Sequence, residues 1–145
     1  MTAVHRHFTL DELRDYLVQV FPEIWKRDYY AIDAVGPKTA TMRLRHHPDH
    51  LRPGGTISGP AMFALCDVAL YVAILHEIGR VKLAVTTNMS INFLRKPAPR
   101  DLIGEAKLIK LGKRLAVGEV GIHAEGETDL VAHAVGTYSI PDRAD

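Results

Sequence analysis

Asp67 is the one charged residue in the most apolar stretch of the chain. Every other residue between Pro60 and Leu75 is apolar. A buried carboxylate is costly unless it is paired or put to use, and in an apolar setting it is a stronger base than in water. Asp67 is therefore the first candidate for chemistry, as a general base or as a nucleophile. The alternative is a structural acid that is hydrogen-bonded to backbone across an interface.

Gly59 is the second candidate, because it lies where this stretch begins. The first turn of a helix has backbone N–H groups without helical partners, and it is the positive end of the helix dipole. Such an N–H can stabilise the oxyanion that develops on a carbonyl under attack. Glycine adds no side chain that would block a ligand, and Pro60 suits the first helical position. Gly59 could also serve only as an N-cap, a role that glycine tolerates.

The spacing of these two residues predicts that they work in different subunits. Gly59 and Asp67 are eight residues apart, which is about 12 Å along a helix at ~1.5 Å per residue. One chain cannot easily aim both at the same carbonyl. We therefore expect an obligate homodimer in which Gly59 of one subunit faces Asp67 of the other.

The stretch that carries both residues is predicted to be a buried helix. Residues 58–77 are apolar on nearly all sides of a helix, which is typical of a core helix, and Gly79 follows as a C-cap. The run is too short, and its central acid too costly, for a good membrane span. Such a helix needs cover on nearly every side, and a curved sheet can supply that cover.

The patterns on either side of this helix predict the rest of the fold. Thr9 and Glu12 match a capping box at the start of a helix over residues 10–20. Alternating apolar residues and turn signals predict strands at 31–35, 39–45, 85–93, 101–111, 115–124 and 130–140. The fold class is therefore α+β, with a long central helix wrapped by a curved antiparallel sheet of five to six strands. We expect a single domain over residues 1–145, with a helical extension at 1–25 and a tail at 141–145.

The strand over residues 85–93 shows a clean alternation with a period of two. One face would carry Val85, Thr87, Met89, Ile91 and Phe93. The other face would carry Thr86, Asn88, Ser90 and Asn92.

Composition argues against several classes of protein. The 145 residues fit one domain, and the formal net charge of +1 argues against a dedicated nucleic-acid binder. Cys66 is the single cysteine, so no intrachain disulfide can form, which fits a cytoplasmic location. No segment has the pattern of a signal peptide or a membrane span. His46, His47 and His50 lack partners at a familiar ligand spacing, so no metal site is expected.

Several features in a fixed order resemble those of one known family. They are Gly54-Gly55 before the helix, Ser58-Gly59 at its start, Ala-Leu-Cys-Asp at residues 64–67, Asn-Phe-Leu-Arg-Lys-Pro-Ala at 92–98 and Leu-Gly-Lys-Arg-Leu-Ala at 111–116. Over about residues 30–140 the chain resembles the hotdog-fold acyl-CoA thioesterases, and most of all the phenylacetate-pathway (PaaI-like) type. The resemblance implies the hotdog fold and hydrolysis of a small or aromatic acyl-CoA.

The resemblance also implies roles for individual residues. The backbone N–H of Gly59 would polarise the thioester carbonyl, and Asp67 would be the acid on the family's helix. The hydroxyl that helps to place the attacking water would fall on Thr86, or on its neighbour Thr87, and we favour Thr86.

Three positions depart from the family pattern. Ser58 replaces a histidine, Pro60 replaces a second glycine, and Arg52 stands where the family has an asparagine upstream of the helix. Proline has no N–H to donate. These changes bear on the rate and the substrate more than on the type of reaction.

The substrate would be held by basic and apolar side chains. Basic side chains bind the phosphates that coenzyme A carries, and an apolar helix flank suits an acyl group. Candidate phosphate contacts are Arg95, Lys96, Lys113 and Arg114, candidate acyl contacts are Met62, Phe63 and Tyr71, and further candidate substrate contacts are Ser58 and Asn88. No cofactor is expected beyond coenzyme A as part of the substrate. The expected partners are the acyl-CoA and further copies of the chain, in a homodimer that pairs into a homotetramer.

Two other functions stay open at this point. A hotdog enoyl-CoA hydratase or dehydratase would normally pair a histidine with the acid, and the helix has no histidine near Asp67. We therefore rank that function lower. A non-catalytic acyl-CoA-binding protein is made plausible by the changes at Ser58 and Pro60.

Overall fold

The structure, a computed structural model, describes residues 7–25, 27–79 and 84–141. Within these ranges the elements are α1 (Leu10–Val20), α2 (Pro22–Trp25), β1 (Tyr30–Gly36), β2 (Thr39–Leu44), a short 3-10 helix (Pro48–His50), α3 (Gly59–Ile78), β3 (Val85–Phe93), β4 (Leu102–Leu111), β5 (Leu115–Ala124) and β6 (Leu130–Ser139). The predicted long helix and six predicted strands are confirmed. The short α2 is an addition that the sequence patterns did not predict.

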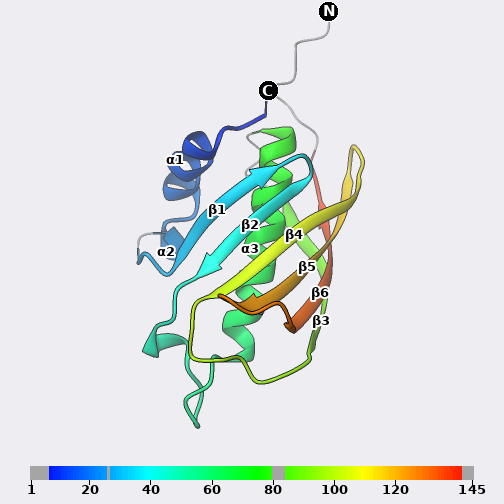
Figure 1. The fold of residues 1–145 in the computed structure, drawn as a ribbon. Helices are drawn as coiled ribbons and strands as arrows, with labels where there is room; N and C mark the ends of the chain where they lie inside the picture. Colours follow the sequence, from blue (N-terminus) through cyan, green and yellow to red (C-terminus); the bar gives the residue numbers. More distant parts are fainter. Residues whose placement is uncertain (1–6, 26, 80–83, 142–145) are drawn as a thin grey trace, which may run out of the picture.

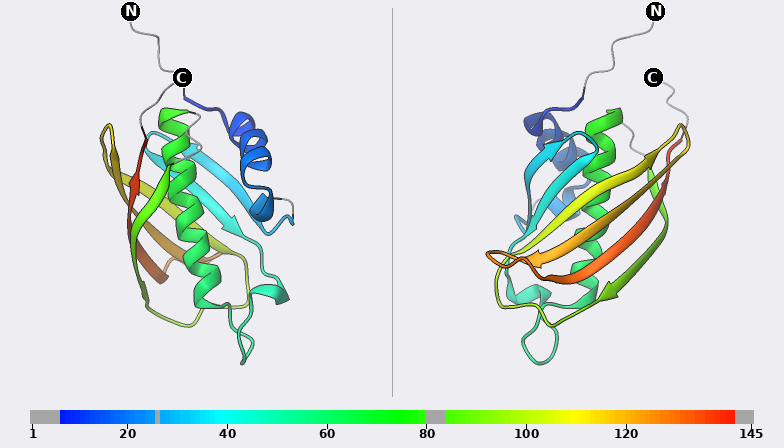
Figure 2. Two further views of the ribbon diagram at one scale, coloured as in Figure 1. Left: turned by 180° about the vertical axis from the view of Figure 1, so that it is seen from behind. Right: turned by 45° about the vertical axis from the view of Figure 1, so that its right-hand side comes forward.

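The six strands form one antiparallel sheet in the order β1-β2-β4-β5-β6-β3. The sheet wraps around α3, which runs along one of its faces (Figure 1). Seen from behind, α3 lies in front of the sheet, with α1 on one side of it and β3 on the other (Figure 2). This arrangement confirms the predicted α+β class and the hotdog architecture. The strands at the two edges of the sheet are β1 and β3.

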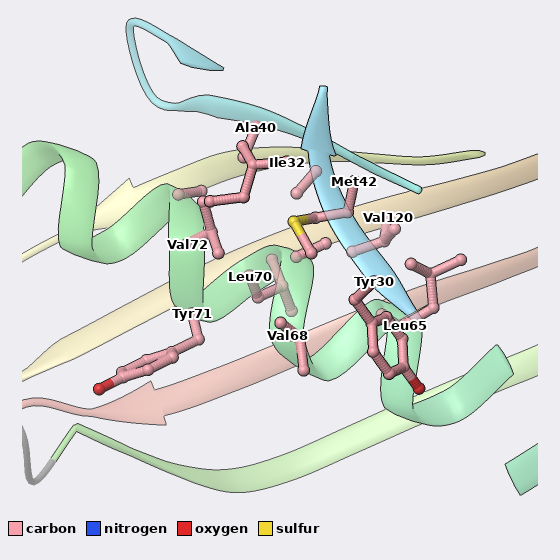
Figure 3. Close-up of a cluster of buried hydrophobic side chains, with 14 of the residues drawn as sticks. Tyr30, Ile32, Ala40, Met42, Leu65, Val68, Leu70, Tyr71, Val72 and Val120 are labelled. Carbon is pink, nitrogen blue, oxygen red and sulfur yellow. The ribbon is translucent and has the colours of Figure 1, made fainter. Parts of the chain in front are cut away.

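Helix α3 forms the centre of the core. The Ser58 hydroxyl caps its N-terminus by accepting a hydrogen bond from the Ala61 N–H (3.2 Å), and Gly79, at φ 82°, ends it. Figure 3 shows its side chains packed against the sheet, with Leu65 among the buried residues. By length and composition α3 could cross a membrane, but 78% of that stretch is buried inside this fold, as in the core helix of a soluble protein.

Two glycines let α3 approach the sheet closely. Gly118 of β5 and Gly136 of β6 are register partners. A Cβ added at Gly118 would lie 2.6 Å from Leu70 Cδ2, and one added at Gly136 would lie 2.8 Å from Leu70 Cδ1. Because real Cβ atoms do not come so near, the Leu70 side chain fits only over a pair of residues without side chains.

The N-terminal helices pack onto the rest of the fold. The predicted capping box at Thr9 and Glu12 is present, with both of its hydrogen bonds. Leu17 of α1 is fully buried in the core. The Arg14 side chain donates a hydrogen bond to the main-chain oxygen of Ile32 in β1 (2.9 Å). Helix α1 is thereby fixed to both the core and an edge strand.

Strand β3 departs from the alternation predicted for residues 85–93. Thr86 pairs with Tyr138 of β6, whereas Asn88 pairs with the residue before Tyr138, so a β-bulge lies between Thr86 and Asn88. A bulge adds one residue on one strand and reverses the alternation beyond it. The prediction that Thr86 and Met89 lie on opposite faces is therefore wrong: Thr86 contacts α3, and Met89 packs against the core as well.

Candidate active site

Asp67 lies in the middle of α3 and is held by side chains from two strands. Its Oδ1 accepts hydrogen bonds from Thr86 Oγ1 of β3 (2.5 Å) and from the Tyr138 hydroxyl of β6. The Tyr138 hydroxyl also lies 2.6 Å from the Asp67 main-chain oxygen. Within the described part of the chain, no hydrogen bond involves Asp67 Oδ2. One carboxylate oxygen is thus fixed inside its own subunit, and the other remains available.

Asp67 opens onto a pocket of about 700 Å³, a volume in the range of small-molecule sites. The pocket lies between α3, the start of β3, β6 and the N-terminal helices. It is lined by Gln19, Val20, Phe21, Glu23, Asp67, Val68, Tyr71, Ala84, Val85, Thr86 and Tyr138. Asp67 therefore has a cleft beside it, as a catalytic acid needs.

Tyr138 is a site residue that the sequence analysis missed. It reaches Asp67 because Tyr138 and Thr86 are register partners across β6 and β3. Its ring stacks on that of Tyr71 from α3, with centroids 6.4 Å apart and planes at 10°. The only signal in the sequence is a tyrosine in the last predicted strand, and that signal does not say which residue of β3 it faces.

The environment of Tyr138 keeps its hydroxyl protonated. Burial, and then the neighbouring Asp67 carboxylate, raise the pKa of Tyr138 well above its usual value of 10. Burial also raises the pKa of Tyr71 to about 12. At neutral pH both groups are therefore neutral and able to donate hydrogen bonds, and Tyr138 donates to Asp67.

We expect Tyr138 to make the folded state less stable above pH 10. In the unfolded chain a tyrosine loses its proton near pH 10, whereas folded Tyr138 keeps it because its pKa is raised. The unfolded state then binds fewer protons, so the free energy of unfolding falls as the pH rises through this window. Urea denaturation at about pH 8 and about pH 11 measures the fall. It should be smaller for Tyr138→Phe than for the wild type, and equal falls would contradict the assignment.

Gly59 is the first residue of α3, and within the described residues its backbone N–H makes no hydrogen bond. Phe93, at the end of β3, packs over it: a Cβ added at Gly59 would lie 3.2 Å from Phe93 Cζ. Gly59 lines a second cavity, of about 540 Å³, together with the basic residues Arg52, Arg95 and Lys96. An available N–H at a helix N-terminus beside three cations can receive an anion or an oxyanion.

Among the described residues, the pocket at Asp67 and the cavity at Gly59 have no lining residue in common. This agrees with the spacing argument that one chain does not bring both groups to one carbonyl. Strand β3 connects the two places. Thr86 near its start lines the Asp67 pocket, and Phe93 at its end lines the Gly59 cavity.

The predicted substrate contacts fall into two groups. Met62, Arg95 and Lys96 lie with Gly59, and Ser58 caps the helix at the same end. Tyr71 lies with Asp67 instead, extending from α3 away from Tyr30 and Met42 in Figure 3. The structure does not bring Phe63 or Asn88 into either cavity, and both are exposed.

Lys113 and Arg114 lie at the turn between β4 and β5. Arg95 and Lys96 lie in the connection between β3 and β4, which is at the opposite end of the sheet (Figure 1). Leu115, next to this turn, pairs with Ser139, and Ser139 pairs with Val85. The turn is therefore near the start of β3, at the end of the molecule where α3 finishes. The two predicted pairs of phosphate contacts are not neighbours within one chain.

The N-terminal helices contribute residues that the sequence analysis did not connect with the site. Gln19, Val20 and Phe21, at the end of α1, and Glu23 of α2 all line the Asp67 pocket. Glu23 is a second carboxylate there; it is exposed, and within the described part of the chain it makes no hydrogen bond to Asp67. Nothing in residues 19–23 marks them as site residues, because only the packing of α1 against α3 brings them to this place.

One group of the described residues has the side chains of a metal site. Ligand atoms of His7, His76 and Glu77 lie within 4.8 Å of one another. The group lies at the C-terminal end of α3, and His7 Nε2 pairs with Glu77 Oε2 (3.1 Å). His47, one of the histidines considered from the sequence, accepts a hydrogen bond at Nδ1 from the Asp49 N–H (3.0 Å). Neither group contacts the Asp67 pocket.

Comparisons with known proteins support a single family. The model of the Thioesterase superfamily matches residues 54–131. A crystal structure from Silicibacter sp. TM1040, described as a "putative thioesterase", has 51% sequence identity and a TM-score of 0.84, covering 92% of each chain. A mutant of the phenylacetic acid degradation protein PaaI from Thermus thermophilus is 24% identical, with a TM-score of 0.70 over 81% of this chain and 97% of that one, which supports the fold alone.

A curated relative from Saccharolobus solfataricus is named "Putative esterase" and is 33% identical over 89 residues. The match covers 61% of this chain and spans 58% of the length of that relative. The region matched by the family model includes both Gly59 and Asp67 and makes up more than half of the chain. The family resemblance seen in the sequence is thereby confirmed, and the chain belongs to the thioesterase superfamily.

Proposed function

We propose that the protein is a thioester hydrolase that acts on an acyl-CoA, with Asp67 as the group that starts the reaction. One observation carries this proposal: a carboxylate stands in a pocket with one oxygen fixed by Thr86 and Tyr138 and the other unused. Membership of the thioesterase superfamily and a 51% identical structure described as a thioesterase support the type of reaction.

The chemistry can follow two routes. As a general base, Asp67 Oδ2 would take a proton from a water whose oxygen attacks the thioester carbon. The tetrahedral oxyanion would then collapse, the C–S bond would break, and the thiolate of coenzyme A would leave and take up the proton. As a nucleophile, Oδ2 would attack the same carbon, expel the thiolate and form an anhydride that water then hydrolyses. In both routes the hydrogen bonds to Oδ1 fix the carboxylate in place.

The oxyanion donor would come from a second subunit. Strand β3 is an edge of the sheet, and it exposes Val85 (53%) and Phe93 (51%). An unpaired edge is a template for another strand. If two copies of β3 paired antiparallel, the Thr86 end of one would lie opposite the Phe93 end of the other. The Gly59 cavity of one subunit would then adjoin the Asp67 pocket of its partner. The proposed assembly is a cytoplasmic homodimer, and two such dimers would make the homotetramer.

The phosphates of coenzyme A would bind at the Gly59 cavity. Arg52, Arg95 and Lys96 line this cavity, and basic side chains bind phosphate by charge-assisted hydrogen bonds. In the antiparallel dimer, the turn with Lys113 and Arg114 of the partner subunit would approach the same end. The two groups of cations that are separate in one chain would then serve one substrate.

A thiol-release assay tests the proposal. The purified protein is mixed with short, long and aromatic acyl-CoAs, and free coenzyme A is measured with a thiol reagent. We expect release of coenzyme A that follows Michaelis–Menten kinetics with at least one of these thioesters. Tight binding without release would favour the acyl-CoA-binding protein, and hydration of an enoyl-CoA without release would favour the hydratase. Either outcome would contradict a thioesterase.

A further inference from the structure

We propose that the N-terminal extension forms one wall of the acyl-binding site, and that this wall selects bulky apolar acyl groups over short ones. This inference depends on the proposed thioesterase function and adds the acyl specificity to it. It starts from the Asp67 pocket, to which the end of α1 contributes Gln19, Val20 and Phe21. The available oxygen of Asp67 lies in the same pocket, so the group attached to the attacked carbonyl would extend along this wall.

The wall is held firmly in place. Leu17, one turn before the wall, is fully buried in the core. The Phe21 N–H donates a hydrogen bond to the Leu17 main-chain oxygen (2.8 Å) and ends α1. Val20 and Phe21 themselves pack against the core. A wall that is fixed in this way can discriminate between substrates by shape.

The chemistry of the wall fits an apolar ligand. Two of the three wall residues, Val20 and Phe21, are apolar, and Val68 and the ring of Tyr71 line the pocket from α3. The polar Gln19 and Glu23 also line it, and both are exposed. The polar groups Thr86 and Tyr138 are already bound to Asp67. With a volume of about 700 Å³, the pocket is much larger than an acetyl group and offers contact area to a longer alkyl chain or an aromatic ring.

The wall lies outside the part of the chain that the family model matches. That match begins at residue 54, well after Gln19 to Phe21. The catalytic groups and the acyl wall therefore come from different parts of the sequence. The wall can change the preferred acyl group without a change in the groups that carry out the reaction.

Narrowing the wall tests the inference. Gln19 and its neighbour Val18 are both exposed on α1, but only Gln19 lines the pocket, so Gln19→Trp has a matched control in Val18→Trp. The experiment measures kcat/KM of each variant for butyryl-, decanoyl- and phenylacetyl-CoA, and circular dichroism checks that each variant is folded. Gln19→Trp should lower the ratio of kcat/KM for the bulky substrates to kcat/KM for butyryl-CoA by at least about tenfold. Val18→Trp should leave this ratio at the wild-type value. Phe21→Ala, which widens the pocket, should shift the preference toward the larger substrates.

The outcomes separate this inference from the function on which it rests. If the wild type hydrolyses acyl-CoA and neither Gln19→Trp nor Phe21→Ala changes this ratio, the inference that the wall selects the acyl group is wrong, whereas the proposed thioesterase activity is unaffected. An equal change of the ratio with Val18→Trp would also contradict the inference, because the Val18 side chain does not line the pocket. If the wild type releases no thiol from any acyl-CoA, the proposed function fails, and the inference fails with it.

Discussion

Asp67→Asn is expected to lower kcat for thioester hydrolysis by about 10²–10⁴-fold, the range of a lost general base. The amide cannot take a proton from water or attack a carbonyl. Its oxygen can still accept the hydrogen bonds that Thr86 and Tyr138 donate to Asp67 Oδ1. The fold should therefore survive, and KM should change much less than kcat. Thiol release under steady-state conditions measures both constants.

Glu23→Gln is the comparison that this experiment needs. Glu23 is the other carboxylate that lines the pocket, but it is exposed and lies on α2 rather than on the central helix. Its substitution should reduce kcat far less than Asp67→Asn does. If Glu23→Gln abolished turnover while Asp67→Asn retained it, the catalytic carboxylate would be Glu23 and the assignment to Asp67 would be wrong. If Asp67 is confirmed as the catalytic carboxylate, a single-turnover reaction in ¹⁸O water separates the general-base route from the nucleophilic route. Only a nucleophilic Asp67 can take up the label.

The elements that were predicted correctly depend on neighbouring residues in the sequence. The capping box at Thr9 and the terminal Gly79 are local signals, and each marks a helix end in the structure. The burial of α3 follows from its composition alone, because a helix without a polar face has to be covered. Asp67 could be singled out for the same reason, as the one acid in that helix.

The parts that were missed depend on pairing between distant segments. The bulge after Thr86 is invisible in a sequence that alternates without interruption, yet it turns Thr86 toward Asp67. Tyr138 lies 71 residues from Asp67, and only the register of β6 against β3 places it there. Likewise, Phe21 has no pattern that marks a ligand site, and it reaches the pocket because α1 packs beside α3.

Gly59→Pro is expected to lower kcat by about 10²–10³-fold, the effect of removing one oxyanion donor. Proline removes the N–H and is tolerated in the first turn of a helix. The preceding residue, Ser58, is already extended at ψ 154°, as a residue before proline prefers. Gly59→Ala is the control, since it keeps the N–H and places a Cβ against the same Phe93 ring. If Ala and Pro reduced kcat equally, crowding and not the lost donor would be the cause.

Mixing two inactive variants tests whether each site is shared between subunits. In the proposed dimer, a subunit with Asp67→Asn still offers Gly59, and a subunit with Gly59→Pro still offers Asp67. A mixed dimer therefore has one site with both changes and one site with neither. After denaturation and refolding of an equal mixture, about half of the dimers are mixed, and about a quarter of the wild-type activity should return. If each subunit used its own Gly59 and Asp67, every site would keep one defect, and mixing would restore nothing.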